Sequence, residues 1–387
     1  MQGIERTYCD ECVRATVGAW KALMETSATE ALNKVRYGKG DTLGLDAIPE
    51  INISEKLRDF DNHAILVTEE LDDIAKKRWP SDADPVKQPL MFFSDPTDRS
   101  KQLGKFIEKI SAERPFVKIG ELMENINAES VWEDLFEAPA TITGASTSIT
   151  CIRKGAIIFS IVLNYITRTI FVATPIGIFY FCLPSFSDER IEMVNLSYIV
   201  SAGQPLNFLP AKDSCRTPED AKRFVTFLGK KGYRENFNDS MIFVENPDAF
   251  LHHTEPGGPS RILYLSELQK GYGPIGFILA NGEKVSEWMH WLAFAKFARN
   301  AYGGAMLKVF EISIDRPWTK EGVLMSTSPA YSIFSCEGEG GYLDLSRLKN
   351  FEHPSRFRSM LVVTPFDNDR IIYIMRQHEY REVGVSL

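Results

Sequence analysis

Residues 92–100 have the sequence Phe92-Phe93-Ser94-Asp95-Pro96-Thr97-Asp98-Arg99-Ser100. The two aromatic residues indicate the end of a buried strand, and the tight turn that we expect next carries two acids three residues apart. Hard divalent cations prefer oxygen ligands. The carboxylates of Asp95 and Asp98 can bind one ion or bridge two, and the carbonyl of Thr97 can add a neutral ligand. The amides of Arg99 and Ser100 would then begin a helix, whose N-terminus attracts phosphate.

A second short buried strand is predicted at residues 64–68, and it ends in the pair Glu69-Glu70. Two strands that end in carboxylates can bring these groups together at one edge of a sheet. The segment between the strands, residues 71–90, is charged and rich in proline, which is typical of a solvated loop. The sequence therefore predicts one site built from two strand ends.

Two helices are predicted before these strands, over residues 8–36 and 47–60, from apolar residues at helical spacing. A glycine-broken turn between the helices carries Asp41 and Asp46. From the residues alone, Asp41 can be a turn residue and Asp46 the N-cap of the second helix. A helix over residues 101–110 and strands over 148–152, 156–163 and 169–174 are expected to follow the central motif.

The composition is that of an ordinary globular chain of 387 residues, 44% hydrophobic and 25% charged. Its net charge of −8 and its lack of a basic block argue against binding to nucleic acid or to an anionic membrane. Charged residues in the first turns leave no room there for the apolar core of a signal peptide. We therefore expect a cytoplasmic protein.

Three patterns have simpler explanations than the functions they suggest. Residues 156–182 are strongly apolar, but polar and turn-forming interruptions predict successive buried strands rather than a membrane helix. Cys9 and Cys12 form a lone C-x-x-C motif without the second pair that zinc requires, so we interpret them as helix residues in a reducing compartment. Residues 271–276 match a dinucleotide fingerprint, but Pro274 and the apolar residues after it predict a turn into a strand.

The acidic motifs resemble those of the magnesium-dependent, lithium-sensitive phosphatases that include inositol monophosphatase and fructose-1,6-bisphosphatase. The family pattern is a Glu-Glu pair, then Asp-Pro-x-Asp-Gly-Ser/Thr, then one more acid late in the chain. Glu69-Glu70 and the Asp95–Ser100 segment match the first two elements, although Arg99 replaces the family glycine. The resemblance implies an α/β (α+β) fold, a layered αβαβα sandwich of the sugar phosphatase type.

The late acid of the family is missing from this chain. One alignment of the C-terminal region places Ser326 at that position, and a second alignment places Thr319 there. In the first alignment, Lys320 corresponds to a lysine that holds a distal phosphate in the sugar bisphosphatases. An exposed loop lysine is an equally good interpretation of that residue.

The resemblance assigns a role to each matching residue. It implies that Mg²⁺ is held by Glu70, Asp95, Thr97 and Asp98, that Asp46, Ser100 and Glu69 serve catalysis, and that Arg99, Ser100, Lys320 and Ser326 contact the substrate. Asp46 and Ser100 would orient the attacking water. These ligands suit one magnesium ion, whereas a second ion should bind more weakly because a neutral residue replaces the late acid.

We expect an N-terminal α+β half, residues 1–194, that carries the metal motifs, and a C-terminal α/β half, residues 195–387, that contributes substrate contacts. The predicted function is magnesium-dependent hydrolysis of a phosphomonoester of a sugar or inositol phosphate, with a sugar bisphosphate among the candidates. The alternative is a family member with impaired catalysis that binds a phosphorylated ligand or a protein partner. The resemblance also implies a homo-oligomer, a dimer or a tetramer.

Overall fold

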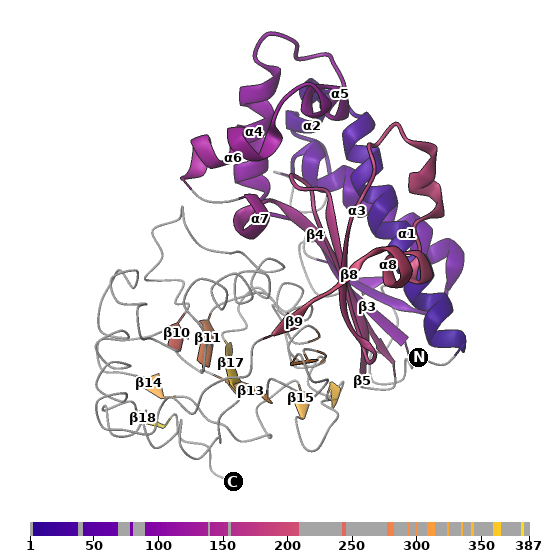
Figure 1. The fold of residues 1–387 in the computed structure, drawn as a ribbon, viewed down its shortest axis with the longest axis vertical. Helices are drawn as coiled ribbons and strands as arrows, with labels where there is room; N and C mark the ends of the chain where they lie inside the picture. Colours follow the sequence, from indigo (N-terminus) through magenta and orange to yellow (C-terminus); the bar gives the residue numbers. More distant parts are fainter. Residues whose placement is uncertain are drawn as a thin grey trace.

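The computed structural model describes residues 3–37, 42–68, 78–79, 90–137, 140–153 and 156–208, with short segments beyond residue 208. In the N-terminal part, the helices are α1 (Gly3–Glu25), α2 (Ala28–Leu32), α3 (Gly44–Phe60), α4 (Ser100–Ser111), α5 (Ile119–Glu124), α6 (Ala128–Phe136), α7 (Ala140–Thr143), the 3-10 helix η1 (Glu189–Met193) and α8 (Leu196–Ala202). Figure 1 shows α2, α4, α5 and α6 gathered beyond one end of the central sheet, next to α1 and α3.

The central sheet has its strands in the order β2 (Arg78–Trp79), β1 (Ile65–Thr68), β3 (Leu90–Asp98), β4 (Ser146–Arg153), β5 (Ala156–Asn164), β6 (Thr169–Thr174), β7 (Gly177–Cys182) and β8 (Gln204–Pro205). β1 and β3 are parallel, whereas the other neighbours along this order are antiparallel. Two short strands also join this sheet, since β16 (Tyr342–Leu343) pairs with both β5 and β15 (Phe334–Ser335).

The other strands described beyond residue 206 form three further groups. A four-stranded sheet has the order β10 (Ile242–Val244), β11 (Phe277–Asn281), β17 (Ser359–Thr364) and β13 (Lys308–Ser313). Two pairs of strands complete the set: β9 (Asn207–Phe208) with β12 (Arg299–Asn300), and β14 (Val323–Leu324) with β18 (Arg381–Glu382). Strands and helices are therefore mixed, and the predicted α/β class is confirmed.

The core forms where α1 packs against β4 and β5, and where α3 packs against β3. One face of α1 is buried at helical spacing, with Val13, Val17, Trp20 and Leu23 among its core residues. β3 and β4 are almost entirely buried, and this burial includes the serine and threonine residues of β4. This packing fixes α3, and with it Asp46, relative to β3.

The single helix predicted over residues 8–36 is wrong, because the chain forms α1 and α2 instead. Ser27 begins α2 with a capping box. The hydroxyl of Ser27 accepts from the amide of Glu30, while the carboxylate of Glu30 accepts from the amide of Ser27 at 3.1 Å. The first backbone amides of a helix have no acceptor within the helix, and these two bonds supply acceptors at the start of α2. A separate helix therefore begins at this point instead of a continuation of α1.

The second predicted helix exists but begins earlier, at Gly44. A Cβ atom at Gly44 would lie 2.3 Å from the carbonyl oxygen of Glu30, so only glycine allows α3 to start this close to α2. Leu43 is the N-cap, and Asp46 lies within the first turn. The interpretation of Asp46 as the N-cap is therefore wrong. Asp41 lies outside the described residues.

Most strand predictions are confirmed. β1 covers its predicted segment except for residue 64, β4 contains its predicted segment, β5 covers its predicted range with one more residue, and β6 has the predicted bounds. β5, β6 and β7 account for the apolar stretch, and no helix within the described ranges is long and apolar enough to cross a membrane. β11 begins at Phe277, as the strand interpretation of that region requires.

Two expectations need correction. The segment expected to be a solvated loop contains β2, which pairs antiparallel with β1. The sequence also predicts a helix over residues 286–302, from aromatic residues on one side of it, but this helix does not reach its predicted end, because Arg299–Asn300 forms β12. Predictions for Glu69, Glu70, Thr319, Lys320 and Ser326 fall outside the described residues, and the division at residue 194 stays a prediction.

Candidate functional site

The site predicted from the sequence lies where two parallel strands end side by side. In the register of β1 and β3, Thr68 is paired with Ser94, so the last residue of β1 lies next to the residue before Asp95. The carboxyl ends of adjacent parallel strands are a common place for ligand sites, because both chains leave the sheet there. Glu69 and Glu70 follow Thr68 in the sequence but lie outside the described residues.

Asp95 and Asp98 lie on a bulged strand rather than on the predicted tight turn. Asp95 pairs with Ser148 and Asp98 with Ser146, so three steps along β3 correspond to two steps along β4. Pro96 lies within this irregularity, where the missing N–H of proline is tolerated. The bulge changes the local direction of the strand, and it holds the Asp95 side chain at 0% exposure.

Thr97 ties this bulge to the start of α3. Its hydroxyl donates to the carbonyl oxygen of Leu45 at 2.8 Å. Within a regular helix the amide of residue 49 would fill this role, but Pro49 has no N–H, so the carbonyl of Leu45 is left for another donor. The hydrogen bond fixes the turn that carries Asp46 against the strand that carries Asp95. Asp46 is itself only 7% exposed.

Tyr165 lies against the bulge that carries Asp95. It is fully buried, and its hydroxyl donates to the carbonyl oxygen of Pro96 at 2.9 Å. Burial raises the pKa of Tyr165 far above its ordinary value, hydrogen bonds with Thr97 and Thr147 act in the opposite direction, and the charges of Asp95 and Asp46 raise it further. Both charges act on this one phenol, so the carboxylates of Asp46 and Asp95 each lie within electrostatic range of Tyr165.

Two further buried residues at this site, Tyr165 and Glu50, were not predicted from the sequence. Glu50 is 1% exposed, and its carboxylate accepts hydrogen bonds from the hydroxyls of Tyr37 and Thr68, each at 2.9 Å. It therefore connects α3 both to the segment before that helix and to the end of β1. The available signal was an acid four residues after Asp46, on the same face of the helix. Tyr165 had no comparable signal.

Arg99 has a left-handed backbone, with φ 63° and ψ 37°, immediately before α4. Glycine adopts this conformation without steric cost, whereas an L-residue pays about 1–2 kcal/mol. The geometry gives a physical reason for glycine at this place in the family pattern. Ser100 is the first residue of α4, and the helix predicted to follow the motif is confirmed.

The described residues fit a hard metal ion in their chemistry. Asp95 and Asp98 supply carboxylate oxygens from one bulge, and oxygen is the ligand atom that Mg²⁺ prefers. The third predicted carboxylate, that of Glu70, lies outside the described part of the chain. Within the described part, no group of three or more histidine, cysteine, aspartate or glutamate side chains is arranged to hold a metal.

Cys9 and Cys12 are core residues, as their interpretation as ordinary helix residues requires. Both are fully buried on α1, and burial raises the pKa of each thiol well above its ordinary value. The charge of Cys151, on β4, also raises the pKa of Cys12, which places this third buried thiol nearby. All three are free cysteines. A buried thiol with a raised pKa is a poor nucleophile and a poor metal ligand.

Comparisons with known proteins give likenesses only among solved structures. No family model and no curated protein matches the chain. CysQ from Bacteroides thetaiotaomicron, a bacterial member of the inositol monophosphatase family, is 12% identical, with a TM-score of 0.45 over 94% of this chain and 98% of that one. An inositol monophosphatase from Anabaena is 10% identical, with a TM-score of 0.44 over 97% and 96% of the two chains.

An inositol monophosphatase from Zymomonas mobilis is 9% identical, with a TM-score of 0.44 over 98% of this chain and 100% of that one. The solved structures named here come from the family that the Glu69-Glu70 pair and the Asp95–Ser100 motif resemble.

Proposed function

We propose that this protein is a magnesium-dependent phosphatase that hydrolyses a phosphomonoester of a sugar or inositol phosphate. The observation that carries the proposal is the hydrogen bond from Thr97 to Leu45, which holds the first turn of α3, with Asp46, against the end of the strand that carries Asp95 and Asp98. Carboxylates that different elements bring together near a strand end, beside a helix N-terminus, suit the handling of a phosphate and its counter-ion.

In this proposal Glu70, Asp95, the carbonyl of Thr97 and Asp98 hold one Mg²⁺ ion. When bound, the ion would lower the pKa of a water molecule and offset negative charge on the phosphate. The protein contributes rigidity, because the hydrogen bond from Thr97 to Leu45 and that from Tyr165 to Pro96 hold both sides of the bulge. Carboxylates held in this way lose little conformational freedom when they bind an ion.

The remaining predicted residues act on water and substrate. The carboxylate of Asp46 accepts a hydrogen bond from the attacking water, the hydroxyl of Ser100 helps to orient it, and Glu69 accepts its proton. The amide of Ser100, at the start of the 12-residue helix α4, faces the phosphate with the positive end of the helix dipole. Arg99 can add a two-pronged contact to phosphate oxygens, while Lys320 and Ser326 bind the rest of the substrate.

Phosphate release from sugar, inositol and nucleotide phosphates, with and without Mg²⁺, tests the proposal. Wild-type protein should show turnover that requires the metal. Asp95→Asn keeps the size of the side chain but removes its charge, so it should lower turnover at least about 100-fold, the upper range for residues that only support a metal ligand. Asp59→Asn, an exposed position on α3, is the matched control and should leave turnover unchanged.

The conformation of Arg99 favours a second candidate, a protein that binds a phosphorylated ligand or a protein partner without hydrolysing it. A large side chain stands where the family has glycine, at the start of the helix that would receive the phosphate. In this case wild-type protein would bind a phosphorylated ligand without turnover, and Arg99→Gly would gain metal-dependent turnover. Turnover in the wild type that Asp95→Asn leaves intact would contradict both candidates.

We also propose a cytoplasmic homo-oligomer, a dimer or a tetramer, that acts on a small phosphorylated substrate rather than on nucleic acid or a membrane. The acidic net charge supports the proposal that the protein does not act on nucleic acid or on a membrane. Light scattering of the purified protein measures the oligomeric state directly, and a monomer at all concentrations would contradict the proposed homo-oligomer.

A further inference from the structure

A cavity of about 690 Å³ lies away from the predicted catalytic residues. It is formed by the second half of α1, by α5 and the start of α6, and by the turn between β5 and β6 together with residues 182–186. None of the described residues assigned to catalysis, metal or substrate lines it. Its volume is within the range of pockets that hold small organic ligands.

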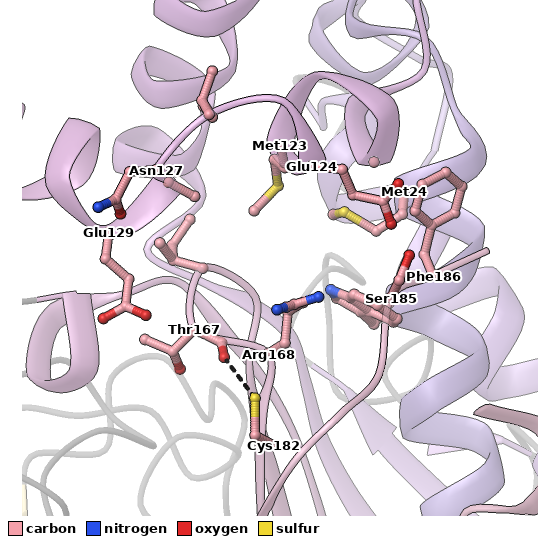
Figure 2. Close-up of a pocket in the computed structure, with 15 residues that line it drawn as sticks. Met24, Met123, Glu124, Asn127, Glu129, Thr167, Arg168, Cys182, Ser185 and Phe186 are labelled. Carbon is pink, nitrogen blue, oxygen red and sulfur yellow. Dashed lines mark hydrogen bonds between the residues drawn. The ribbon is translucent and has the colours of Figure 1, made fainter. Parts of the chain in front are cut away.

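Arg168 is the cation of this cavity. Figure 2 shows its side chain projecting into the cavity from the β5–β6 turn, with Asn127 and Glu129 on one side and Phe186 on the other. Its side chain forms no ion pair or hydrogen bond with the residues that the structure describes, although it is half-buried. Its backbone is left-handed, with φ 57°. Strained residues of this kind often lie at ligand sites.

Other hydrogen-bond donors face the same space. Asn127 caps α6 by accepting from the amide of Ser130, and Asn127, Ala128 and Glu129 all line the cavity. The positive end of this nine-residue helix therefore opens on the cavity. Trp20 also lines the cavity. Its Nε1 group is buried and has no hydrogen-bond acceptor among the described residues, which is rare for a buried indole.

The opposite part of the lining is apolar. Met24, Met123 and Phe186 contribute thioether and aromatic surface. Gly120 allows Phe186 to lie directly on α5, because a Cβ atom there would come within 2.6 Å of the aromatic ring. Glu124 and Glu129, both exposed, also line the cavity and disfavour ligands with several negative charges.

We propose that this cavity binds a small organic anion, a single carboxylate or comparable acid on an apolar ring. The acid group lies against Arg168, the start of α6 and the Trp20 indole, which are all donors. The apolar ring packs against Met24, Met123 and Phe186. The site is separate from the proposed phosphatase site, and it stands whether or not the protein hydrolyses phosphate esters.

Naphthoate is a suitable probe, because it carries one carboxylate on an apolar ring and no phosphate that the catalytic site could take. Titration calorimetry of the full chain should give saturable binding of one naphthoate per chain. Methyl NMR of methionine-labelled protein locates the probe, since the signals of Met24 and Met123 should shift. Naphthalenemethanol, which is neutral, should bind at least about tenfold more weakly, as expected for the loss of a charge-assisted hydrogen bond.

Arg168→Asn is the decisive variant, because asparagine tolerates a left-handed backbone but has no charge. It should weaken naphthoate binding about tenfold or more. Glu137→Asn is the matched control, since Glu137 is also left-handed, at the other end of α6, and does not line the cavity. Glu129→Gln should strengthen binding, because it removes a repelling charge.

The proposal would be overturned by a lack of saturable binding in the wild type, by equal binding of naphthoate to Arg168→Asn and Glu137→Asn, or by methyl signals of Met24 and Met123 that do not shift. Equal binding of naphthalenemethanol would also reject it, because it would reveal an apolar pocket without anion recognition. Trp20→Phe keeps the ring surface but removes the donor, and it should weaken naphthoate binding without affecting naphthalenemethanol.

Discussion

The left-handed backbone of Arg99 is sterically unfavourable, and glycine would remove this cost. Its φ of 63° crowds the Cβ atom at a cost of about 1–2 kcal/mol. Glycine at this position would instead cost about 0.5–1 kcal/mol, because it loses more conformational entropy when the chain folds. Arg99→Gly should therefore raise the free energy of unfolding by up to about 1 kcal/mol. Urea denaturation of the two proteins measures the difference.

Lys105→Gly provides the comparison for Arg99→Gly. Lys105 is exposed in the middle of α4, where the backbone is helical, so glycine should lower stability by about 1 kcal/mol. If both substitutions lower stability equally, the left-handed conformation of Arg99 costs nothing and the argument from strain is wrong.

Tyr165 should make the protein sensitive to alkaline pH. Its pKa in the folded protein is raised above the ordinary value of 10.0, chiefly by burial. Below pH 10 the phenol is protonated in both states, so its contribution is constant. As the pH rises above 10, the unfolded chain loses the proton while the folded protein keeps it, and the free energy of unfolding falls.

Tyr165→Phe tests this contribution. The variant should lose about 1 kcal/mol at neutral pH, because the hydrogen bond to Pro96 is removed, but its stability should fall less steeply above pH 10. Tyr180→Phe, on β7, is the control and should keep the slope of the wild type. Equal alkaline slopes for Tyr165→Phe and the wild type, in urea denaturation at successive pH values, would contradict this contribution of Tyr165.

Glu50 connects secondary-structure elements through its two hydrogen bonds. It joins α3 to the end of β1 through Thr68 and to the segment before α3 through Tyr37. Glu50→Ala should lower the free energy of unfolding by about 2 kcal/mol, because it leaves the buried hydroxyl of Thr68 without this acceptor. The proposed turnover should fall as well, since Thr68 directly precedes Glu69-Glu70.

Glu55→Ala is the matched change on an exposed part of α3 and should be nearly neutral. Glu50→Gln keeps one acceptor and should fall between the two variants in urea denaturation. Equal stability of Glu50→Ala and Glu55→Ala would show that the two hydrogen bonds contribute nothing net.

Element boundaries divide clearly into those that the sequence predicts and those that it does not. β1, β5 and β6 follow from runs of apolar residues, because strands buried on both faces have no polar alternation, whereas β4 is rich in serine and threonine. The break at Ser27 was missed, although the Ser-x-x-Glu capping box is visible in the sequence, because the apolar spacing continues past it. The bulge at Pro96 was predicted as a turn, because proline and acidic residues occur both in turns and in β-bulges.

In the molecule as a whole, burial protects the core cysteines from reaction with reagents in the solvent. Cys9, Cys12 and Cys151 are buried between α1 and the sheet with raised pKa values, while Cys182 is exposed. A thiol reagent should therefore label Cys182 quickly, and the three core cysteines only when the protein unfolds. Mass spectrometry of the labelled peptides gives the rate for each cysteine.

Denaturant provides the control for this labelling experiment. In urea above the unfolding midpoint, the four cysteines should react at similar rates, because the difference comes from the fold and not from the sequence around each thiol. Rapid labelling of Cys9 or Cys12 in the native protein would contradict the core position of the C-x-x-C motif.

The sequence by itself determined the α/β class and the helix after the central motif, because these depend on local patterns of apolar and polar residues. The acidic motif also predicts Asp95 and Asp98 as metal ligands, which stays a prediction. Only the tertiary structure decided that Asp46 lies inside a helical turn near Asp95, that Thr97 fills the gap left by Pro49, and that Tyr165 and Glu50 belong to the same region. These contacts join residues 18 or more positions apart, and no local pattern specifies which distant side chains will meet.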